Sequence, residues 1–258
     1  MERSTFEPAG ASAPPQQDSI LGAALDRLAA VYGVPRPGPP DDPLSELIAT
    51  ILSQHTSDAN SSRAFAALRE RFGSWEAVQR APVEEIAAAI RCGGLAEVKA
   101  RTIKAVLDTL AAERGTLSLD FLRELPTDAA RRYLTVFPGV GEKTAACVLL
   151  FALGRPVVPV DTHVHRVARR LGLVDRRATA AQTEAALERL APPERAYAAH
   201  VLLITHGRRV CRAPTPRCSA CVLRDLCPQI SLGLPGPPRG WPGEPLSLPS
   251  ASGGATRR

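Results

Sequence analysis

The segment 137-FPGVGEKTA-145 carries two glycines around a single valine and separates two stretches of helical character. An amphipathic stretch at 128–137 leads into it, and an apolar run at 144–154 follows it. Glycine adopts the positive φ angles that residues with a Cβ atom avoid. We therefore expect Gly139 and Gly141 to have positive φ and to join two helices in a tight hairpin.

The second helix of this hairpin begins beside Lys143. The first N–H groups of a helix have no intrahelical partner and favour an anion such as a DNA phosphate. We expect the backbone of Gly139, Val140 and Gly141 to make that contact. The same positive end disfavours a neighbouring ammonium and so favours the neutral, nucleophilic amine of Lys143. A phosphate clamp next to an amine nucleophile indicates chemistry on a nucleotide.

Composition limits the size and the class of the protein. With 258 residues, of which 45% are hydrophobic, the chain can bury one large core or two small ones. A net charge of +6 is a weak indication of a polyanionic partner. The longest apolar run, 145–153, is much shorter than the roughly 18 residues of a membrane span, so no membrane partner is expected. The N-terminal residues lack the apolar core of a secretory signal, which predicts a cytoplasmic protein.

Hydrophobic periodicity predicts helices along almost the whole chain between two tails. The tails, 1–17 and 229–258, are rich in Pro, Gly, Ser and Ala and are expected to be disordered. Asp42 followed by Pro43 predicts a capped helix start. Only 156–160 alternates with period two, which is too short for a sheet, so we predict an all-α fold. The expected helices lie at 20–32, 44–52, 59–72, 75–80, 83–91, 98–113, 119–125, 128–137, 144–154, 162–171, 181–190 and 194–205.

Four cysteines follow these helices with the spacing C-x6-C-x2-C-x5-C, namely Cys211, Cys218, Cys221 and Cys227. Four thiolates this close together in a reducing compartment favour a soft cation. One C-x2-C pair with a single cysteine on either side suits a [4Fe–4S] cubane better than zinc, although spacing alone leaves both open. We expect the metal to order the loop and to present Arg212 and Arg217 to DNA phosphates.

Three features together resemble endonuclease III, a branch of the helix-hairpin-helix DNA glycosylase superfamily: the hairpin at 138–145, the tetrad Val160-Asp161-Thr162-His163 and the cysteine spacing. The resemblance runs from about residue 20 to residue 227. It strengthens the choice of [4Fe–4S] over zinc.

The resemblance implies two all-α lobes with a DNA-binding cleft between them. One lobe is a six-helix barrel, at 41–155, that contains the helix-hairpin-helix motif. The other holds the iron–sulfur cluster and is built from the N-terminal helix and linker, at 18–40, together with 156–228. Lys143 and Asp161 then lie on opposite sides of the junction between the lobes.

The same resemblance implies a monomeric base-excision enzyme of the bacterial nucleoid, a DNA glycosylase and AP lyase for oxidised pyrimidines in duplex DNA. Lys143 would attack the sugar of a flipped-out nucleotide, expel the damaged base and form a Schiff base, after which β-elimination breaks the strand. Asp161 would stabilise the cationic sugar or accept a proton from Lys143. Asp161 also suits the N-cap of the helix at 162–171, and the two roles are compatible.

Flipping a base leaves a hole in the duplex, which this family fills with side chains from two loops. Leu95 matches one of these positions. The other falls at 53–58, where His55 occupies a slot that usually holds glutamine and Gln54 lies one residue earlier. The side chain that fills the hole is therefore Gln54 or His55.

Two other functions fit parts of the sequence. A monofunctional mismatch or adenine glycosylase of the same fold would generally lack a lysine at the position of Lys143. The adenine branch also needs an early catalytic glutamate, and Glu46 lies more than one helical turn too early. A non-catalytic DNA-binding protein, with zinc in the cysteine loop, would bind DNA in a salt-dependent way and never cleave it.

Overall fold

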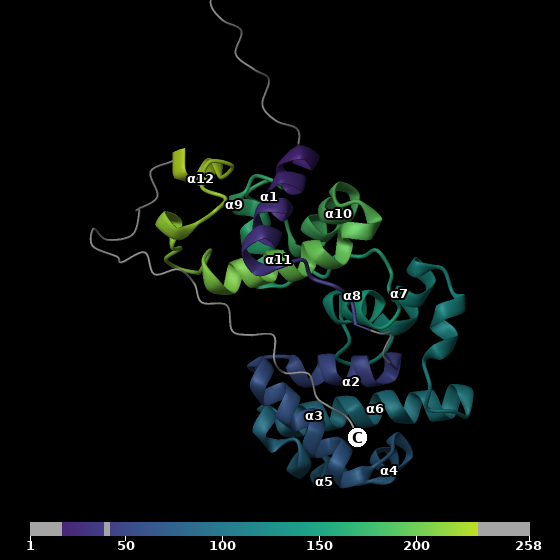
Figure 1. Cartoon of the computed structure of the whole chain (residues 1–258). Helices are drawn as coiled ribbons and strands as arrows, with labels where there is room; N and C mark the ends of the chain where they lie inside the picture. Colours follow the sequence, from purple (N-terminus) through teal and green to yellow (C-terminus); the bar gives the residue numbers. More distant parts are fainter. Residues whose placement is uncertain (1–16, 39–41, 232–258) are drawn as a thin grey trace, which may run out of the picture.

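A computed structural model describes residues 17–38 and 42–231 of the chain (Figure 1). These residues form α-helices and short 3₁₀-helices and no strand, which confirms the predicted all-α class. The predicted tails lie outside these ranges, except that Gln17 begins the first helix and 229–231 belong to the last one. None of the described helices is both long and apolar enough to span a bilayer.

The elements follow one another in the order that the periodicity predicts. They are α1 (Gln17–Tyr32), α2 (Pro43–Ser53), α3 (Asp58–Phe72), α4 (Trp75–Arg80), α5 (Val83–Ala89), η1 (Arg91–Gly93), α6 (Ala96–Arg114), η2 (Asp120–Glu124), α7 (Thr127–Thr135), α8 (Glu142–Phe151), α9 (Thr162–Arg170), α10 (Ala180–Leu190), η3 (Pro193–Arg195), α11 (Ala196–Arg209), η4 (Cys218–Ala220) and α12 (Pro228–Ser231).

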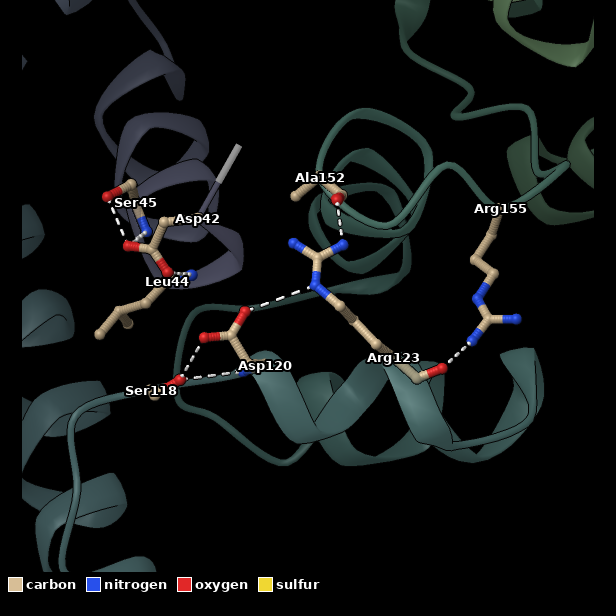
Figure 2. A network of polar contacts seen from close by, with 8 residues as sticks. All are labelled: Asp42, Leu44, Ser45, Ser118, Asp120, Arg123, Ala152 and Arg155. Carbon is tan, nitrogen blue, oxygen red and sulfur yellow. Dashed lines mark hydrogen bonds and ion pairs between the residues drawn. The ribbon is translucent and has the colours of Figure 1, made fainter. Parts of the chain in front are cut away.

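Side-chain caps set several of the helix starts. Asp42 caps α2 as predicted, because its carboxylate accepts from the N–H groups of Leu44 at 3.2 Å and Ser45 at 3.0 Å (Figure 2). Ser57 caps α3 in the same manner, and Thr179 forms a full capping box at the start of α10. Short polar residues ahead of an apolar period are therefore sufficient to place these boundaries.

Two separate hydrophobic cores divide the described residues into two lobes. The barrel core gathers buried residues between Leu44 and Val157. The second core begins at Val158 and extends to Leu223, and it also includes the buried face of α1. Accordingly, α1 lies beside α9, α10 and α11 in Figure 1, away from α2 to α6, although it precedes all of them in sequence.

A polar network fixes the C-terminal end of α8 in the barrel (Figure 2). Arg123 of η2 donates to the Ala152 carbonyl at 3.0 Å and is itself held by Asp120 at 3.4 Å. Arg155, just beyond α8, donates back to the Arg123 carbonyl at 2.7 Å. Since α8 also packs against α2 and α7, its N-terminal end has little freedom to move.

The two lobes meet along α7, α8, α10 and α11. Phe151 of α8 makes edge contacts with the rings of Tyr197, at 5.8 Å, and His200, at 5.5 Å, both on α11. Arg131 of α7 forms ion pairs with two carboxylates of α10, Glu184 and, at 2.8 Å, Glu188. The mostly buried Arg131 side chain thus joins the lobes electrostatically as well as sterically.

We expect Arg131→Met to lower the free energy of unfolding by about 3 kcal/mol, because it leaves Glu184 and Glu188 without their cation in a poorly hydrated interface. Urea denaturation followed by circular dichroism measures the loss. The control is Arg71→Met, which breaks the exposed pair with Glu85 and should cost less than about 1 kcal/mol. Equal losses in the two variants would show that Arg131 does not join the lobes.

Candidate active site

The predicted hairpin joins α7 to α8 through residues 136–141. Gly139 has a φ of +73°, as predicted, and a Cβ atom there would lie 3.1 Å from the side chain of Thr102. Both the backbone angle and the lack of space therefore require glycine. The prediction for Gly141 is wrong: its φ is −91° and its ψ is 179°, because it is the extended N-cap residue of α8.

The barrel holds the hairpin from two sides. The Val140 side chain is buried in the barrel core, and its N–H donates to the Phe137 carbonyl at 3.1 Å to close the turn. From the end of α2, Gln54 Nε2 donates to the Gly139 carbonyl at 3.2 Å and to Thr144 Oγ1 at 3.3 Å. These bonds tie the Gln54 amide to the hairpin, whereas the His55 side chain is exposed.

Lys143 and Asp161 line one cavity of about 1320 Å³ between the lobes. Lys143 comes from the first turn of α8 in the barrel, and Asp161 comes from the N-cap of α9 in the second lobe. Gln54 and His55 line the same cavity, whereas Leu95 does not. The structure thus brings the two predicted catalytic residues together from segments on either side of the lobe boundary.

The chain has three lysines, and Lys143 is the one that lines this cavity. Lys99 is buried and donates to two backbone carbonyls. Lys104 pairs with Asp108, one turn along the same helix, at 3.5 Å. Of the lysine amines, only that of Lys143 is therefore available to a substrate in the cavity. A count of lysines in the sequence would have limited the candidates to three.

Two ionisable side chains near Lys143, those of Cys147 and His200, have strongly shifted pKa values. Burial raises the pKa of the Cys147 thiol to about 11, with Lys143 opposing the shift and with Glu46 and Asp161 adding to it. Burial likewise lowers the pKa of His200 to about 4, and its Nδ1 donates to the Pro159 carbonyl at 2.8 Å. Cys147 and His200 are therefore uncharged at neutral pH.

Asp161 is the N-cap of α9, as expected for one of its two roles. Its Oδ1 accepts from the N–H groups of His163 at 2.9 Å and Val164 at 2.8 Å. Both cap bonds use the same oxygen, so the second oxygen, Oδ2, takes no part in the cap. One side chain can therefore fix the start of the helix and also line the cavity.

The two loops predicted to enter the duplex share an unusual backbone conformation. Among the described residues, His55, with a φ of 54°, and Leu95, with a φ of 49°, are the two non-glycine residues with positive φ. Such a conformation costs about 1–2 kcal/mol for residues with a Cβ atom, and it is concentrated at functional sites. The His55 side chain is exposed, and Leu95, an apolar side chain, is 56% exposed.

Arginines, most of them not predicted as site residues, make the cavity strongly cationic. The lining includes three arginines of α9, namely Arg166, Arg169 and Arg170, as well as Arg176 and Arg208. The lining acids are Asp161 and Asp58, and Asp58 pairs with Arg208 at 2.6 Å. The basic run that follows Asp161 in the sequence was the available signal.

Two of these α9 arginines, Arg166 and Arg170, also donate hydrogen bonds to the cysteine loop. Arg166 Nε donates to the Cys211 carbonyl at 2.9 Å, and burial lowers its pKa. Arg170 donates to the Arg212 carbonyl at 2.8 Å and to Cys211 Sγ at 3.3 Å. Hydrogen bonds from α9 therefore connect the cavity wall to the cysteine loop.

The four cysteines line a second cavity, of about 240 Å³, with apolar walls that include Leu223. Burial and the neighbouring thiols raise the pKa of Cys221 to about 11, and His206 Nε2 lies 3.5 Å from its sulfur. Within residues 17–38 and 42–231, no three His, Cys, Asp or Glu side chains converge on one point as a single ion requires. The four thiols instead lie along the wall of one cavity.

Arg212 and Arg217, the predicted phosphate contacts of the loop, do not line the large cavity. Arg212 is exposed and donates to the Arg208 carbonyl at 3.1 Å. Arg217 lines the cysteine cavity. The loop arginines therefore do not belong to the wall that α9 forms.

Comparison with known proteins agrees with this geometry. The model of one family, described as HhH-GPD superfamily base excision DNA repair protein, matches residues 48–193. Endonuclease III of Thermotoga maritima is 35% identical over 193 residues, which cover 75% of this chain and 86% of that protein. Among solved structures, an endonuclease III trapped as a covalent intermediate with DNA matches with a TM-score of 0.70 at 32% identity, over 81% of this chain and 95% of that one.

A plant protein is also similar. It is an Arabidopsis thaliana protein named as a putative DNA glycosylase, and it is 44% identical over 165 residues. The match covers 64% of this chain and 56% of the plant protein, so this chain spans little more than half the length of that relative.

The dual role of Asp161 predicts different stabilities for two substitutions. Asp161→Asn keeps an oxygen that can cap α9 and should change the free energy of unfolding by no more than about 0.5 kcal/mol. Asp161→Ala removes the cap and should cost about 1 kcal/mol. Thermal unfolding of the three proteins side by side measures this difference, and an equal loss for Asn and Ala would refute the cap as a contribution to stability.

Proposed function

The chain belongs to the HhH-GPD superfamily of base excision DNA repair proteins and is a DNA glycosylase, and we propose that it is a bifunctional one. It removes oxidised pyrimidines from double-stranded DNA as a monomer and then cleaves the strand at the abasic site as an AP lyase. The observation that carries this proposal is that Lys143, the one lysine of the cavity, lines it together with Asp161.

The lyase step needs an amine, and Lys143 supplies it. Its Nζ attacks C1′ of a nucleotide flipped into the cavity, the N-glycosidic bond breaks, and the base leaves with its bonding electrons and takes up a proton. The sugar ring opens to give a Schiff base with Nζ. Loss of a proton from C2′ then expels the 3′ phosphate, and water releases the lysine. The 32% identical endonuclease III trapped covalently on DNA supports this chemistry.

Asp161 stabilises the positive charge that develops in this reaction, and the arginines of α9 attract the negative DNA backbone. Positive charge develops on the sugar as the base departs, and a carboxylate at the cavity wall stabilises it. Arg166, Arg169 and Arg170 give the same wall the positive potential that attracts the DNA backbone. The N-terminal end of α8 offers its N–H groups to a phosphate beside Lys143.

A flipped-out nucleotide needs a replacement in the duplex. His55 and Leu95 are exposed at the tips of two loops, and both have the positive φ described above. We assign them the two positions that fill the hole, with His55 in place of Gln54, because the Gln54 amide is bonded to the hairpin.

The cysteine loop would hold a [4Fe–4S] cluster through Cys211, Cys218, Cys221 and Cys227. The arrangement of the thiols around one cavity supports this, as does the guanidinium of Arg170 against the Cys211 sulfur. When bound, the cluster supplies the iron–thiolate bonds that order the loop against α9. In this proposal the ordered loop fixes the side chains of Arg166 and Arg170 in the cavity wall, because both donate hydrogen bonds to loop carbonyls.

The monofunctional alternative finds less support. Glu46, the early acid that an adenine glycosylase would need, accepts a hydrogen bond from Thr50 at 3.0 Å and does not line the cavity. A non-catalytic DNA-binding protein has no need for an amine and a carboxylate in one cavity, as Lys143 and Asp161 provide. Both observations favour the bifunctional enzyme.

Borohydride reduction tests the lyase step. We expect the protein to form a covalent adduct with a duplex that contains one oxidised pyrimidine, because borohydride reduces the Schiff base to a stable amine. Lys143→Gln should lose the adduct completely, while Lys104→Gln, which removes a lysine outside the cavity, should keep it. Gel electrophoresis under denaturing conditions detects the adduct.

Two other results of that reduction are informative. Release of free base without any adduct, also on an abasic site, would make the monofunctional glycosylase the better description. An adduct that persists in Lys143→Gln would move the nucleophile to another amine.

Metal analysis tests the cluster. The purified protein should contain about four irons and about four inorganic sulfides per chain, and chelation with oxidation should unfold the loop that Arg166 and Arg170 hold. One zinc per chain without sulfide would show that the cysteines form a zinc site instead. Elemental analysis together with a sulfide assay distinguishes the two.

A further inference from the structure

A buried lysine outside the cavity joins the two loops that reach for the duplex. Lys99 of α6 is 2% exposed. Its Nζ donates to the Leu52 carbonyl at 2.7 Å and to the Gly93 carbonyl at 2.9 Å. Leu52 lies three residues before His55, and Gly93 lies two residues before Leu95.

Both acceptors are carbonyls at helix ends. Leu52 belongs to the last turn of α2, and Gly93 ends the 3₁₀-helix η1. Carbonyls in the last turn of a helix have no intrahelical partner and carry partial negative charge, so an ammonium is a favourable partner for them. Burial lowers the pKa of Lys99, and these two charge-assisted bonds compensate its lost hydration.

Packing and backbone conformation also restrict the His55 loop and the Leu95 loop. A Cβ atom on Gly93 would lie 3.0 Å from Ala64 Cβ, so this loop is packed tightly against α3. Two or three residues after the bonded carbonyls, the chain passes through Leu95 and His55 at positive φ. A strained conformation of this kind persists only where its neighbours fix it, and Lys99 contacts both neighbours at once.

We propose that Lys99 is a positioning residue that holds the His55 loop and the Leu95 loop at the separation needed to enter the DNA duplex together. This role rests on the proposed function, because it presupposes that the enzyme fills a hole in DNA. Lys99 itself touches neither the cavity nor the substrate. It acts through the backbone, whereas its neighbour Lys104 on the same helix binds the Gln79 carbonyl and Asp108, away from both loops.

The test measures recognition of the hole rather than catalysis. The quantity is the ratio of the affinities for a duplex with one tetrahydrofuran abasic-site analogue and for the same duplex without it. This ratio does not change when a variant only lowers the folded fraction. Lys99→Met removes the ammonium and keeps the apolar stem, and Lys104→Met is the matched control. Lys99→Gln, which keeps N–H donors on a shorter stem, replaces Lys99→Met should the latter fail to fold.

We expect Lys99→Met to lower the ratio about tenfold and Lys104→Met to leave it unchanged. Leu95→Ala should lower the ratio by a similar factor. The double variant Lys99→Met/Leu95→Ala should lose little more than either single variant, because both changes remove the same insertion into the duplex.

Unchanged discrimination in Lys99→Met, or losses that multiply in the double variant, would overturn the positioning role while the proposed function stands. A wild-type protein that does not distinguish the two duplexes would overturn the proposed function and the role of Lys99 together. The wild-type ratio therefore separates the two failures.

Discussion

The close packing of Gly139 against Thr102 fixes where α8 begins, and the position of Lys143 follows from it. A side chain at residue 139 would need the space that Thr102 occupies, and the φ of +73° would be strained for any residue with a Cβ atom. Val140 in the core and Gln54 from α2 hold the same turn from two further directions. At its other end, α8 is bonded through Arg123 to η2. The amine thus sits at the start of a helix that is held at both ends.

The second lobe supplies what the barrel lacks. Asp161 brings a carboxylate to the cavity, and its Oδ1 fixes α9, so that the helix and the charge cannot be displaced independently. α9 also brings the arginines of the cavity wall and binds the backbone of the cysteine loop. Arg131 and Phe151 keep the two lobes together. The site therefore depends on a lobe interface, and neither lobe contains it alone.

Much of this was predictable because local signals decide it. Helical periodicity gave the all-α class, and Asp42 with Pro43 gave the start of α2. The tight turn at Gly139 followed from the two glycines, but the role of Gly141 did not, since an extended N-cap residue and a positive-φ residue can both be glycine. The sequence did not reveal that Gln54 bonds the hairpin or that Lys99 bonds two distant carbonyls. Those contacts depend on which helices become neighbours.

The arginines of the cavity show the same limit. Charge in the sequence marked Arg212 and Arg217 as phosphate contacts, whereas the cavity is lined by the arginines of α9. The amino-acid composition gives the number of basic residues. Which of them face the cavity depends on how α9 packs against α11.

The most direct test of the central claim, that Lys143 is the nucleophile, is to locate the covalent adduct. After borohydride reduction on an abasic-site duplex, nuclease digestion leaves a sugar remnant on the attacking amine, and peptide mass spectrometry finds it. The chain offers three lysines for this modification, Lys99, Lys104 and Lys143. The remnant should be on Lys143. A remnant on Lys99, on Lys104 or on the N-terminal amine would contradict the site described above.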